Sequence, residues 1–355
     1  MSADSNAYAR AGVDIALGNQ VKATLPQLLA SATRPEVLGE VGGFGGLFAL
    51  DAKKYDQPTL VSSVDGVGTK LKLAFQTGCH DTIGEDLVNH CVNDIAVCGA
   101  EPLFFLDYLG AGTLEPDVFE AVLAGFARGC AANHCALLGG ETAQMPGFYQ
   151  KGEYDVSGCI VGVVDRAHLL DGSGIQEGDV VIGLESNGLH TNGYSLARSI
   201  LFDTMGLSVG DSVEGIDGTI GAELLRVHRS YLGFIQSAIA DQRKASSGRP
   251  YRAFAHITGG GFWDNIPRTL PEAFAVEIQR GSWPIQPVFQ VMQKNGNVAE
   301  QEMFHVFNMG IGLTAIVDAE VADATIALAA ANNCPAWKIG TVVHRDGGEA
   351  VRLVG

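Results

Sequence analysis

Glycine is the feature that most constrains how this chain can fold. It supplies 46 of the 355 residues, about 13%, against a usual share of roughly 7%. No collagen period explains the excess, because the glycines fall in short clusters. Glycine adopts backbone conformations that are closed to other residues. The clusters therefore mark places where the backbone turns tightly or comes close to a ligand.

The charge balance limits what the chain can bind. It has 23 Lys and Arg against 40 Asp and Glu, a net charge of −17 at pH 7. A chain this acidic repels a phosphate backbone, so no nucleic acid partner is expected. An anionic small molecule would need backbone N–H groups, a few placed cations or a bound metal ion.

Neither a membrane span nor a disulfide framework is expected. No uncharged apolar run approaches the roughly 18 residues of a transmembrane helix, and residues 1–7 lack the apolar segment of a signal peptide. The seven cysteines form no C-x-x-C pair, and several lie in apolar runs. These features predict buried free thiols in a cytoplasmic protein without a membrane partner.

At about 150 residues per domain, the length corresponds to roughly two domains. Turn-forming residues at 171–174 predict domains at 1–170 and 171–355. Strands and helices mix in both halves, which predicts an α+β protein. Strands are expected at 59–64, 103–108, 136–138, 156–164, 180–184, 273–278, 310–317 and 338–343. Helices are expected at 82–98, 117–133, 193–202, 221–240 and 319–332, with a loop at 242–250.

Residues 64–70, Val-Asp-Gly-Val-Gly-Thr-Lys, follow an expected strand. Their spacing matches neither a Walker A loop nor a G-x-G-x-x-G fingerprint. Asp65 could hold a hard cation, the N–H groups of residues 66–69 could bind phosphate, and Lys70 could balance its charge. The alternative is an ordinary strand-to-helix turn that Asp65 caps.

The helix at 82–98 carries a polar stripe without a cation. Its members span an arc of about 140°: Asp86, Asn89, His90, Asn93 and Asp94. Two interpretations stay open, a solvated face and a metal-binding face. His90 by itself is more typical of a hydrogen-bonded structural residue than of a metal ligand.

Three further glycine-rich segments carry polar groups. At 138–147, Glu141 and Thr142 follow two glycines and suit Mg²⁺ or a phosphate-bearing ligand, or else form a simple turn. At 186–195, a helix start could bind an anion, and His190 could polarise a substrate or transfer a proton. The alternative is that Asn192 or Ser195 caps the helix and His190 is a structural residue. At 256–268, three consecutive glycines suit either a phosphate cradle or a structural turn.

Acidic and amide oxygens outnumber cations in each of these segments. A nucleotide phosphate in so acidic a protein then requires Mg²⁺, held by carboxylates, to screen its charge. No activated nucleophile stands out, which favours phosphoryl transfer by positioning and electrostatics. The residues thus predict a Mg-ATP-dependent enzyme with a phosphorylated substrate.

Taken in order, the motifs resemble the phosphoribosylformylglycinamidine cyclo-ligase (AIR synthetase) family over nearly the whole chain. Each motif alone is weak, but the ordered set is specific. The motifs lie at 8–15, 35–37, 42–46, 65–70, 93–94, 99–102, 106–108, 139–146, 192–195, 258–267 and 307–312. A selenophosphate synthetase, which shares the ATP-binding fold, would need a reactive cysteine near the start, and the first one here is Cys79.

The resemblance implies an activity and an assembly. ATP would phosphorylate the formyl amide oxygen of formylglycinamidine ribonucleotide, and the amidine nitrogen would then close the ring to aminoimidazole ribonucleotide. The family also implies a homodimer in which the N-terminal sheets pair into a barrel, while helices cover the C-terminal sheet. The alternatives are another ATP-dependent phosphotransferase of this fold and a degenerate nucleotide-binding paralogue.

The resemblance also implies roles for single residues, which are expectations from the family pattern. Magnesium ligands would be Asp65, Asp94 and Glu141. Nucleotide contacts would be Gly66, Val67, Gly68, Thr69, Lys70, Asn93, Asp107, Gly139 and Gly140, beside Asp65. Substrate contacts would be His190, Thr191, Asn192, Gly193, Tyr194, Ser195, Gly259, Gly260 and Gly261. The catalytic residues would be Lys70, His190 and Asp94.

Three positions depart from the family pattern. Gln144 replaces a second Glu, Ala9-Arg10 replaces an acidic or lysine-bearing segment, and Val227-His228 replaces Pro-Thr. The first removes a carboxylate that could bind metal or act as a base. The others affect N-terminal ATP contacts and the entry to a helix.

Overall fold

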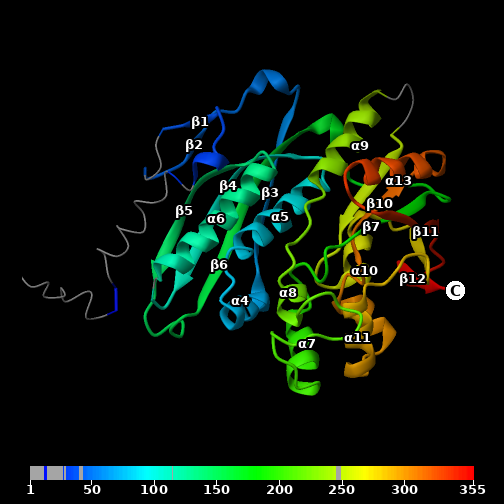
Figure 1. The fold of residues 1–355 in the computed structure, drawn as a ribbon. Helices are drawn as coiled ribbons and strands as arrows, with labels where there is room; N and C mark the ends of the chain where they lie inside the picture. Colours follow the sequence, from blue (N-terminus) through cyan, green and yellow to red (C-terminus); the bar gives the residue numbers. More distant parts are fainter. Residues whose placement is uncertain (1–11, 14–26, 28, 40–42, 114, 245–248) are drawn as a thin grey trace, which may run out of the picture.

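A computed structural model describes residues 12–13, 27, 29–39, 43–113, 115–244 and 249–355. Within them the chain forms two large sheets in succession, shown side by side in Figure 1, and a separate two-stranded sheet of β1 (Val37–Leu38) and β2 (Leu47–Phe48). The first uses strands up to residue 165 and the second uses strands from residue 180 on. The predicted α+β class with two mixed units is therefore confirmed. Most of the motif at 8–15 and residue 42 of the motif at 42–46 lie outside the described residues.

The first sheet has four strands in the order β3-β6-β4-β5, of which β4 and β5 run parallel. The strands are β3 (Pro58–Gly66), β4 (Glu101–Ala111), β5 (Ala136–Gln144) and β6 (Tyr154–Asp165). Helices α5 (Ile83–Ala96) and α6 (Pro116–Ala132) pack on one face, where Phe105 and Ile160 share a buried core with Leu87. The smaller elements are β1 (Val37–Leu38), β2 (Leu47–Phe48), α4 (Leu71–Thr77) and 3₁₀ turns at Ala30–Ala32, Ala52–Lys54, Gly68–Lys70 and Arg166–His168.

Within the described residues the other face of this sheet, named the open face, is largely exposed, although Phe48 of β2 contacts Phe104 there. Side chains alternate along β3, so Leu60 and Val64 point away from the helices and are 62% and 67% exposed. The strand register places Leu106 and Tyr108 of β4 on the same face. Pairing of two such sheets into a barrel stays a prediction, because one chain is described.

The second sheet has six strands in the order β12-β9-β11-β7-β10-β8. The strands are β7 (Val180–Glu185), β8 (Tyr251–His256), β9 (Phe274–Gln279), β10 (Ile311–Val317), β11 (Ala336–His344) and β12 (Val351–Val354). The α-helices are α7 (Tyr194–Arg198), α8 (Ile220–Leu224), α9 (Leu232–Lys244), α10 (Gly261–Asn265), α11 (Pro287–Gly296), α12 (Glu300–Val306) and α13 (Ala322–Ala331). A π-helical turn at Ser199–Thr204 continues α7, and 3₁₀ turns lie at Ile266–Thr269 and Ala319–Val321.

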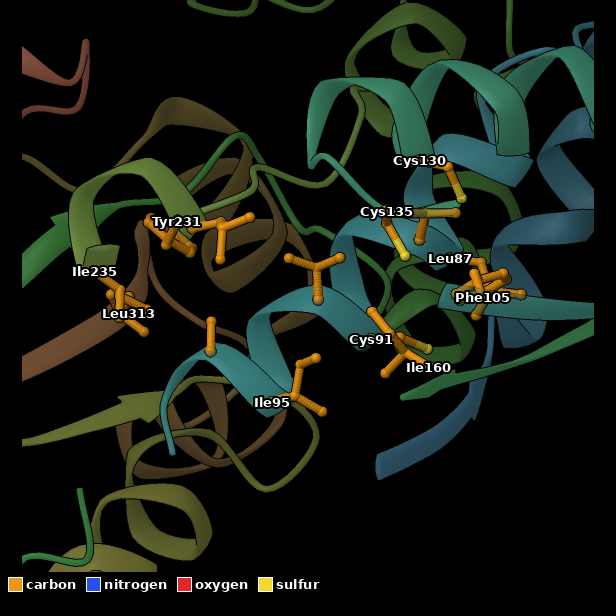
Figure 2. Packing of buried hydrophobic residues seen from close by; sticks show 14 of the residues in the cluster. Leu87, Cys91, Ile95, Phe105, Cys130, Cys135, Ile160, Tyr231, Ile235 and Leu313 are labelled. Carbon is orange, nitrogen blue, oxygen red and sulfur yellow. The ribbon is translucent and has the colours of Figure 1, made fainter. Parts of the chain in front are cut away.

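Helix α5 joins the two halves. In Figure 2 its residues Leu87, Cys91 and Ile95 lie between first-sheet residues such as Phe105 and second-domain residues such as Tyr231. All of them belong to one buried cluster. The side of α5 that the sequence marks as polar is therefore close to the second domain.

The structure differs from the expected elements in several places. The segment at 139–144 is the second half of strand β5 and not a turn. The expected helix at 221–240 is two helices, α8 and α9, separated by residues 225–231. Strands β8 and β12 and helices α11 and α12 were not expected from the sequence.

All seven cysteines are free, as predicted, and four of them are buried. Among the described residues, no helix is long and apolar enough to span a membrane.

Candidate active site

The polar stripe of α5 is buried against the second domain. Four of its five residues are buried, and Asp94 is partly exposed: Asp86, Asn89, His90 and Asn93 have at most 6% of their surface accessible. The interpretation of this stripe as a solvated face is therefore wrong. Its polar groups meet residues 225–231, the segment that separates α8 from α9.

Two asparagines of the stripe hold this segment by its backbone. The side-chain amide of Asn89 donates to the His228 carbonyl, and that of Asn93 donates to the Arg229 carbonyl, each at 2.8 Å. The Tyr231 amide donates in turn to Asn93 Oδ1 at 2.8 Å. These bonds replace helical backbone bonds, which explains why the expected helix is interrupted. They also use both ends of the Asn93 amide, so in this structure Asn93 binds the second domain, and its contact with nucleotide stays a prediction.

Lys70 is a buried connection between the domains. Its Nζ lies 2.8 Å from Asp86, in an ion pair that is fully buried on both sides, and donates to the carbonyls of His190 at 3.2 Å and Arg226 at 2.8 Å. Asp86 also accepts from the His228 amide at 2.8 Å. Burial raises the pKa of Asp86 to about 6. The three ammonium protons already have protein acceptors, so a contact of Lys70 with phosphate would have to replace one of them; that contact stays a prediction.

Four histidines from four segments gather beside this connection. His90 lies on α5, His190 in the loop before α7, His228 between α8 and α9, and His256 at the end of β8. All four are buried. His228 Nε2 lies 3.0 Å from His256 Nε2, and the rings of His190 and His228 stack with centroids 3.9 Å apart.

Thr191 connects two of these imidazoles. Its Oγ1 lies 2.7 Å from His90 Nδ1 and 3.3 Å from His228 Nδ1. Thr191 is itself 9% exposed. A residue predicted to contact substrate therefore organises the histidine cluster in this structure.

His190 is held inside the protein. It adopts a left-handed backbone conformation with φ of 63°, and its Nε2 accepts from the Asn187 amide at 2.9 Å. Among the described residues, its buried Nδ1 has no hydrogen-bond partner. Burial and the neighbouring His256 hold the pKa of His190 well below its usual value. The side chain is fully buried, and its predicted contact with substrate stays a prediction.

Asp65 and Asp94 each face an imidazole. Asp65 Oδ2 lies 2.8 Å from His90 Nε2, and Asp94 Oδ1 lies 2.8 Å from His256 Nδ1. Burial alone would raise the pKa of both acids, but the facing histidines outweigh it and leave both pKa values lowered. Ser63 Oγ also donates to Asp94 Oδ2 at 2.9 Å.

The facing acids act differently on the two histidines. Burial would lower the pKa of His90, yet the hydrogen bond to Asp65 and the charge of Asp94 raise it. For His256 burial prevails over Asp94, and the pKa is lowered. Burial and the adjacent His190 place the pKa of His228 well below its usual value.

Glu141 does not join the other two acids within one chain. The register aligns Asp65 with Gly158, Asp107 and Gly140 across the sheet, on the face that carries α5. Glu141 is the next residue along β5, so its side chain points to the open face. The predicted three-acid metal site is therefore not assembled by a single chain.

Asp107 lies on the helix-covered face, in the same row of the sheet as Asp65. Burial raises its pKa to about 7. A Cβ on Gly140 would come within 2.3 Å of Asp107 Oδ1, so this glycine makes room for the carboxyl group. The structure thus accounts for Gly140 by packing; Gly139 is a strand residue beside Leu106.

An exposed polar surface forms where the two glycine-rich loops meet. Thr69 Oγ1 lies 3.1 Å from Ser195 Oγ, and both residues are exposed. Gly259 is exposed too, and a Cβ placed on it would lie 3.3 Å from Asn192 Oδ1. Gly68, with φ of 64°, has no atom near its missing Cβ. The loops expected to bind nucleotide and substrate are therefore brought together.

Other residues of these loops serve the fold. The Gly66 amide donates to Asp65, and Val67 is buried. The Tyr194 hydroxyl donates to two backbone carbonyls, and Gly193, at the start of α7, packs against Phe307. Gly260 and Gly261 have φ of 88° and 56°, and a Cβ on Gly261 would lie 1.9 Å from the Phe304 carbonyl oxygen. Both glycines are thus required by the backbone conformation and packing, and their predicted contact with substrate or phosphate stays a prediction.

His228, His256 and Asp86 are the functional candidates that sequence reasoning left out. The sequence marks His228 as a departure from the family pattern and His256 as the start of a glycine motif, but no spacing places them together. Asp86 belongs to the polar stripe, and the absence of cations from that stripe is the signal that pointed to it.

A cavity of about 520 Å³ lies away from these loops. Its lining includes Arg34, Glu101 and Gln236. Arg34 is already paired with Glu36 at 2.8 Å and donates to the carbonyls of Pro102 and His134. The cavity contains none of the residues predicted to bind nucleotide or substrate.

Comparison with known protein families covers both domains. The N-terminal domain of AIR synthase related proteins matches residues 49–164, and the C-terminal domain matches residues 176–352. The phosphoribosylformylglycinamidine cyclo-ligase of Geobacillus thermodenitrificans is 51% identical over 342 residues, which are 96% of each chain. That of Geotalea uraniireducens is 47% identical over 355 residues, which are 100% of each chain.

Solved structures resemble the chain at lower identity. Thiamine-monophosphate kinase from Stenotrophomonas maltophilia superposes with a TM-score of 0.65 at 20% identity, covering 97% of both chains. Hydrogenase maturation protein HypE in complex with ATP superposes with a TM-score of 0.66 at 16% identity, covering 94% of this chain and 90% of that one. These likenesses show a shared fold.

Proposed function

The chain belongs to the family of AIR synthase related proteins, and from this we propose that it is a phosphoribosylformylglycinamidine cyclo-ligase. It closes the imidazole ring of 5-aminoimidazole ribonucleotide from formylglycinamidine ribonucleotide, a step of purine biosynthesis, and converts ATP to ADP and phosphate. The observation that carries this proposal is the identity of 51% and 47% to relatives of that name over nearly all of both chains.

The chemistry needs positioning more than a reactive side chain. The γ-phosphoryl group of ATP passes to the formyl amide oxygen, the amidine nitrogen attacks that carbon and loses a proton, and the C–O bond breaks to release phosphate. Ring closure is intramolecular, so holding the two groups together lowers much of the barrier. The exposed hydroxyls of Thr69 and Ser195 and the backbone at Gly68 and Gly259 supply neutral donors suited to phosphate.

ATP as the phosphoryl donor is supported by the chemistry of the named relatives. A protein of the same fold has been solved with ATP. The predicted set of three magnesium ligands is split between the two faces of the sheet within one chain. We therefore assign no step to a protein-bound Mg²⁺; the location of the protein in the cytoplasm stays a proposal as well.

A homodimer is the proposed assembly. The open face of the first sheet exposes Leu60 and Val64, at 62% and 67%, beside Tyr108. A second copy of the same sheet would bury these side chains. Sedimentation equilibrium should give twice the chain mass, and Val64→Asp should shift the protein toward the monomer. The control Ala327→Asp, at an exposed position of α13, should not.

The test of the activity is ADP release with and without formylglycinamidine ribonucleotide, together with detection of aminoimidazole ribonucleotide by mass spectrometry. We expect ADP and product in equal amounts. Thiamine monophosphate serves as the second substrate, because a kinase of that substrate shares the fold. ADP release with thiamine monophosphate and none with the amidine would replace the proposed activity by a kinase activity.

A matched pair of variants tests the exposed surface. Ser195→Ala removes a hydroxyl that meets Thr69 and faces solvent. Ser237→Ala removes an exposed hydroxyl on α9 that donates to the Gly233 carbonyl. We expect a several-fold higher KM for Ser195→Ala and an unchanged KM for Ser237→Ala. Equal KM values would remove Ser195 from the binding surface.

A further inference from the structure

The histidine cluster is larger than phosphoryl transfer by positioning requires. Three of its polar side chains present donor atoms to one another: one nitrogen each of His90 and His256 and a carboxylate oxygen of Asp94 lie within 4.8 Å of one another. They come from α5 and β8, elements far apart in the sequence. Nothing in ring closure calls for two imidazoles on one carboxylate.

The separations of these donors suit a small divalent ion. His256 Nδ1 lies 2.8 Å and His90 Nε2 lies 3.7 Å from the two oxygens of Asp94. Ligands about 2.0–2.2 Å from a tetrahedral ion are about 3.3 Å from one another. The two observed separations involve different oxygens of Asp94 and lie on either side of that value, so the side chains must shift to bring one donor from each residue to bonding distance.

The ring planes distinguish this group from a second set of three histidines. His190, His228 and His256 also approach within 4.8 Å. However, His190 and His228 stack at 3.9 Å with an interplanar angle of 21°, and two nearly parallel rings cannot both point a lone pair at one ion. The rings of His90 and His256 lie at 77° to each other, an angle that lets both planes contain a common point.

The outer contacts of the two imidazoles use the ring nitrogens that do not face Asp65 or Asp94. His256 uses Nε2 toward His228 at 3.0 Å, and His90 uses Nδ1 toward Thr191 at 2.7 Å. The inner nitrogens, His256 Nδ1 and His90 Nε2, face Asp94 and Asp65 at 2.8 Å, where a ring N–H can donate to a carboxylate. A metal ion would take the place of these two protons, and each neutral ring would then carry its proton on the outer nitrogen.

We propose that His90, His256 and Asp94 bind a divalent transition-metal ion of the zinc, cobalt or iron(II) class. Two imidazoles and one carboxylate are ligands typical of such ions, whereas Mg²⁺ takes mainly oxygen ligands and water. Each ligand has an outer hydrogen-bond partner that orients it: Thr191, His228 and Ser63. Asp94 is 25% exposed, which leaves the ion accessible from outside and free to bind water or an oxygen ligand.

Asp65 takes part when the ion binds. It accepts from His90 Nε2 at 2.8 Å, and this contact must give way to the bond with the ion. Asp65 is 43% exposed, so it can turn to solvent or to water on the ion. The site is built from protein donors alone and does not depend on the proposed ring-closing activity.

The test is direct metal binding to the full-length protein after treatment with a chelator and dialysis. Cobalt(II) is the probe, because its visible d–d absorption reports nitrogen ligands, and calorimetry gives its stoichiometry. We expect one Co²⁺ per chain, displaced by equimolar Zn²⁺ and retained in a hundredfold excess of Mg²⁺. His256→Gln should weaken Co²⁺ binding at least tenfold.

Two further variants keep the proposal testable. His305→Gln removes an exposed histidine of α12 that lies outside the cluster, and its Co²⁺ affinity should equal that of the wild type. Thr191→Val removes an outer partner and keeps both imidazoles; it should weaken binding by about tenfold, and it replaces His256→Gln if that variant does not fold. Absence of bound Co²⁺, binding unchanged in these cluster variants, or displacement by Mg²⁺ in up to hundredfold excess would overturn the proposal and leave the two ring N–H groups as the donors to the carboxylates.

Discussion

Replacement of Lys70 by Met is the sharpest test of the domain connection. Lys70 and Asp86 form a fully buried ion pair, and the ammonium group also binds two carbonyls of the second domain. Lys70→Met leaves the Asp86 carboxylate buried with the His228 amide as its remaining donor. Removal of one partner from such a pair costs about 3–5 kcal/mol of unfolding free energy.

This cost converts to a measurable shift of the melting temperature. At about 2.1 cal/mol/K per residue, 355 residues have an unfolding entropy of about 0.75 kcal/mol/K. The expected decrease in Tm is therefore about 4–7 °C, by calorimetry or circular dichroism. The double variant Lys70→Met with Asp86→Leu removes both charges and should recover most of the lost stability. The remaining loss should be about 1–2 kcal/mol, because the buried His228 amide has lost its acceptor.

The result also decides between two roles for Lys70. If the lysine bound phosphate instead, Lys70→Met would raise the Kd for ATP and leave Tm nearly unchanged. A Tm decrease below about 1 °C, or a double variant as unstable as the sum of the single variants, would refute the buried connection.

Three further predictions concern stability. The pKa of Asp107 is raised to about 7 from an ordinary 3.8. Between these values the folded state holds a proton that the unfolded chain has lost, so stability falls as pH rises, by up to about 1.4 kcal/mol per pH unit. Asp107→Asn should make this slope less steep in urea unfolding at pH 5, 6 and 7, while Asp86, whose pKa is about 6, keeps its own contribution; equal slopes in wild type and variant would contradict the raised pKa of Asp107. Gly261→Ala places a Cβ 1.9 Å from a carbonyl oxygen and should lower the free energy of unfolding by about 3 kcal/mol or more. Gly281→Ala, also at positive φ but in open space, should lower it by about 1–2 kcal/mol. Equal losses of stability would show that only the backbone φ matters and not the close contact. Tyr194→Phe removes a hydroxyl that donates to two buried carbonyls and should lower stability by about 1–2 kcal/mol with an unchanged KM, so a raised KM in steady-state kinetics would restore Tyr194 to the substrate site.

Local patterns were sufficient for much of the fold. The apolar runs of β3, β4 and β6 and the amphipathic helices α5 and α6 depend on side-chain spacing within one segment, and all were expected near their observed positions. The prediction of one continuous helix at 221–240 was wrong, because the Asn89 and Asn93 amides bind the backbone of residues 228–231. That competition between tertiary and helical hydrogen bonds has no local signature.

The candidate site divides in the same way. The sequence by itself identified the glycine loops, the polar stripe of α5 and the family, since these depend on residue types and their order along the chain. Only the tertiary structure decided that Lys70 is buried with Asp86, that Glu141 lies on the opposite face of the sheet from Asp65, and that four distant histidines meet. The direction in which a side chain faces depends on strand register, and its burial depends on contact between the domains. Register and domain contact form between segments that are far apart in the sequence, so local patterns do not reveal them.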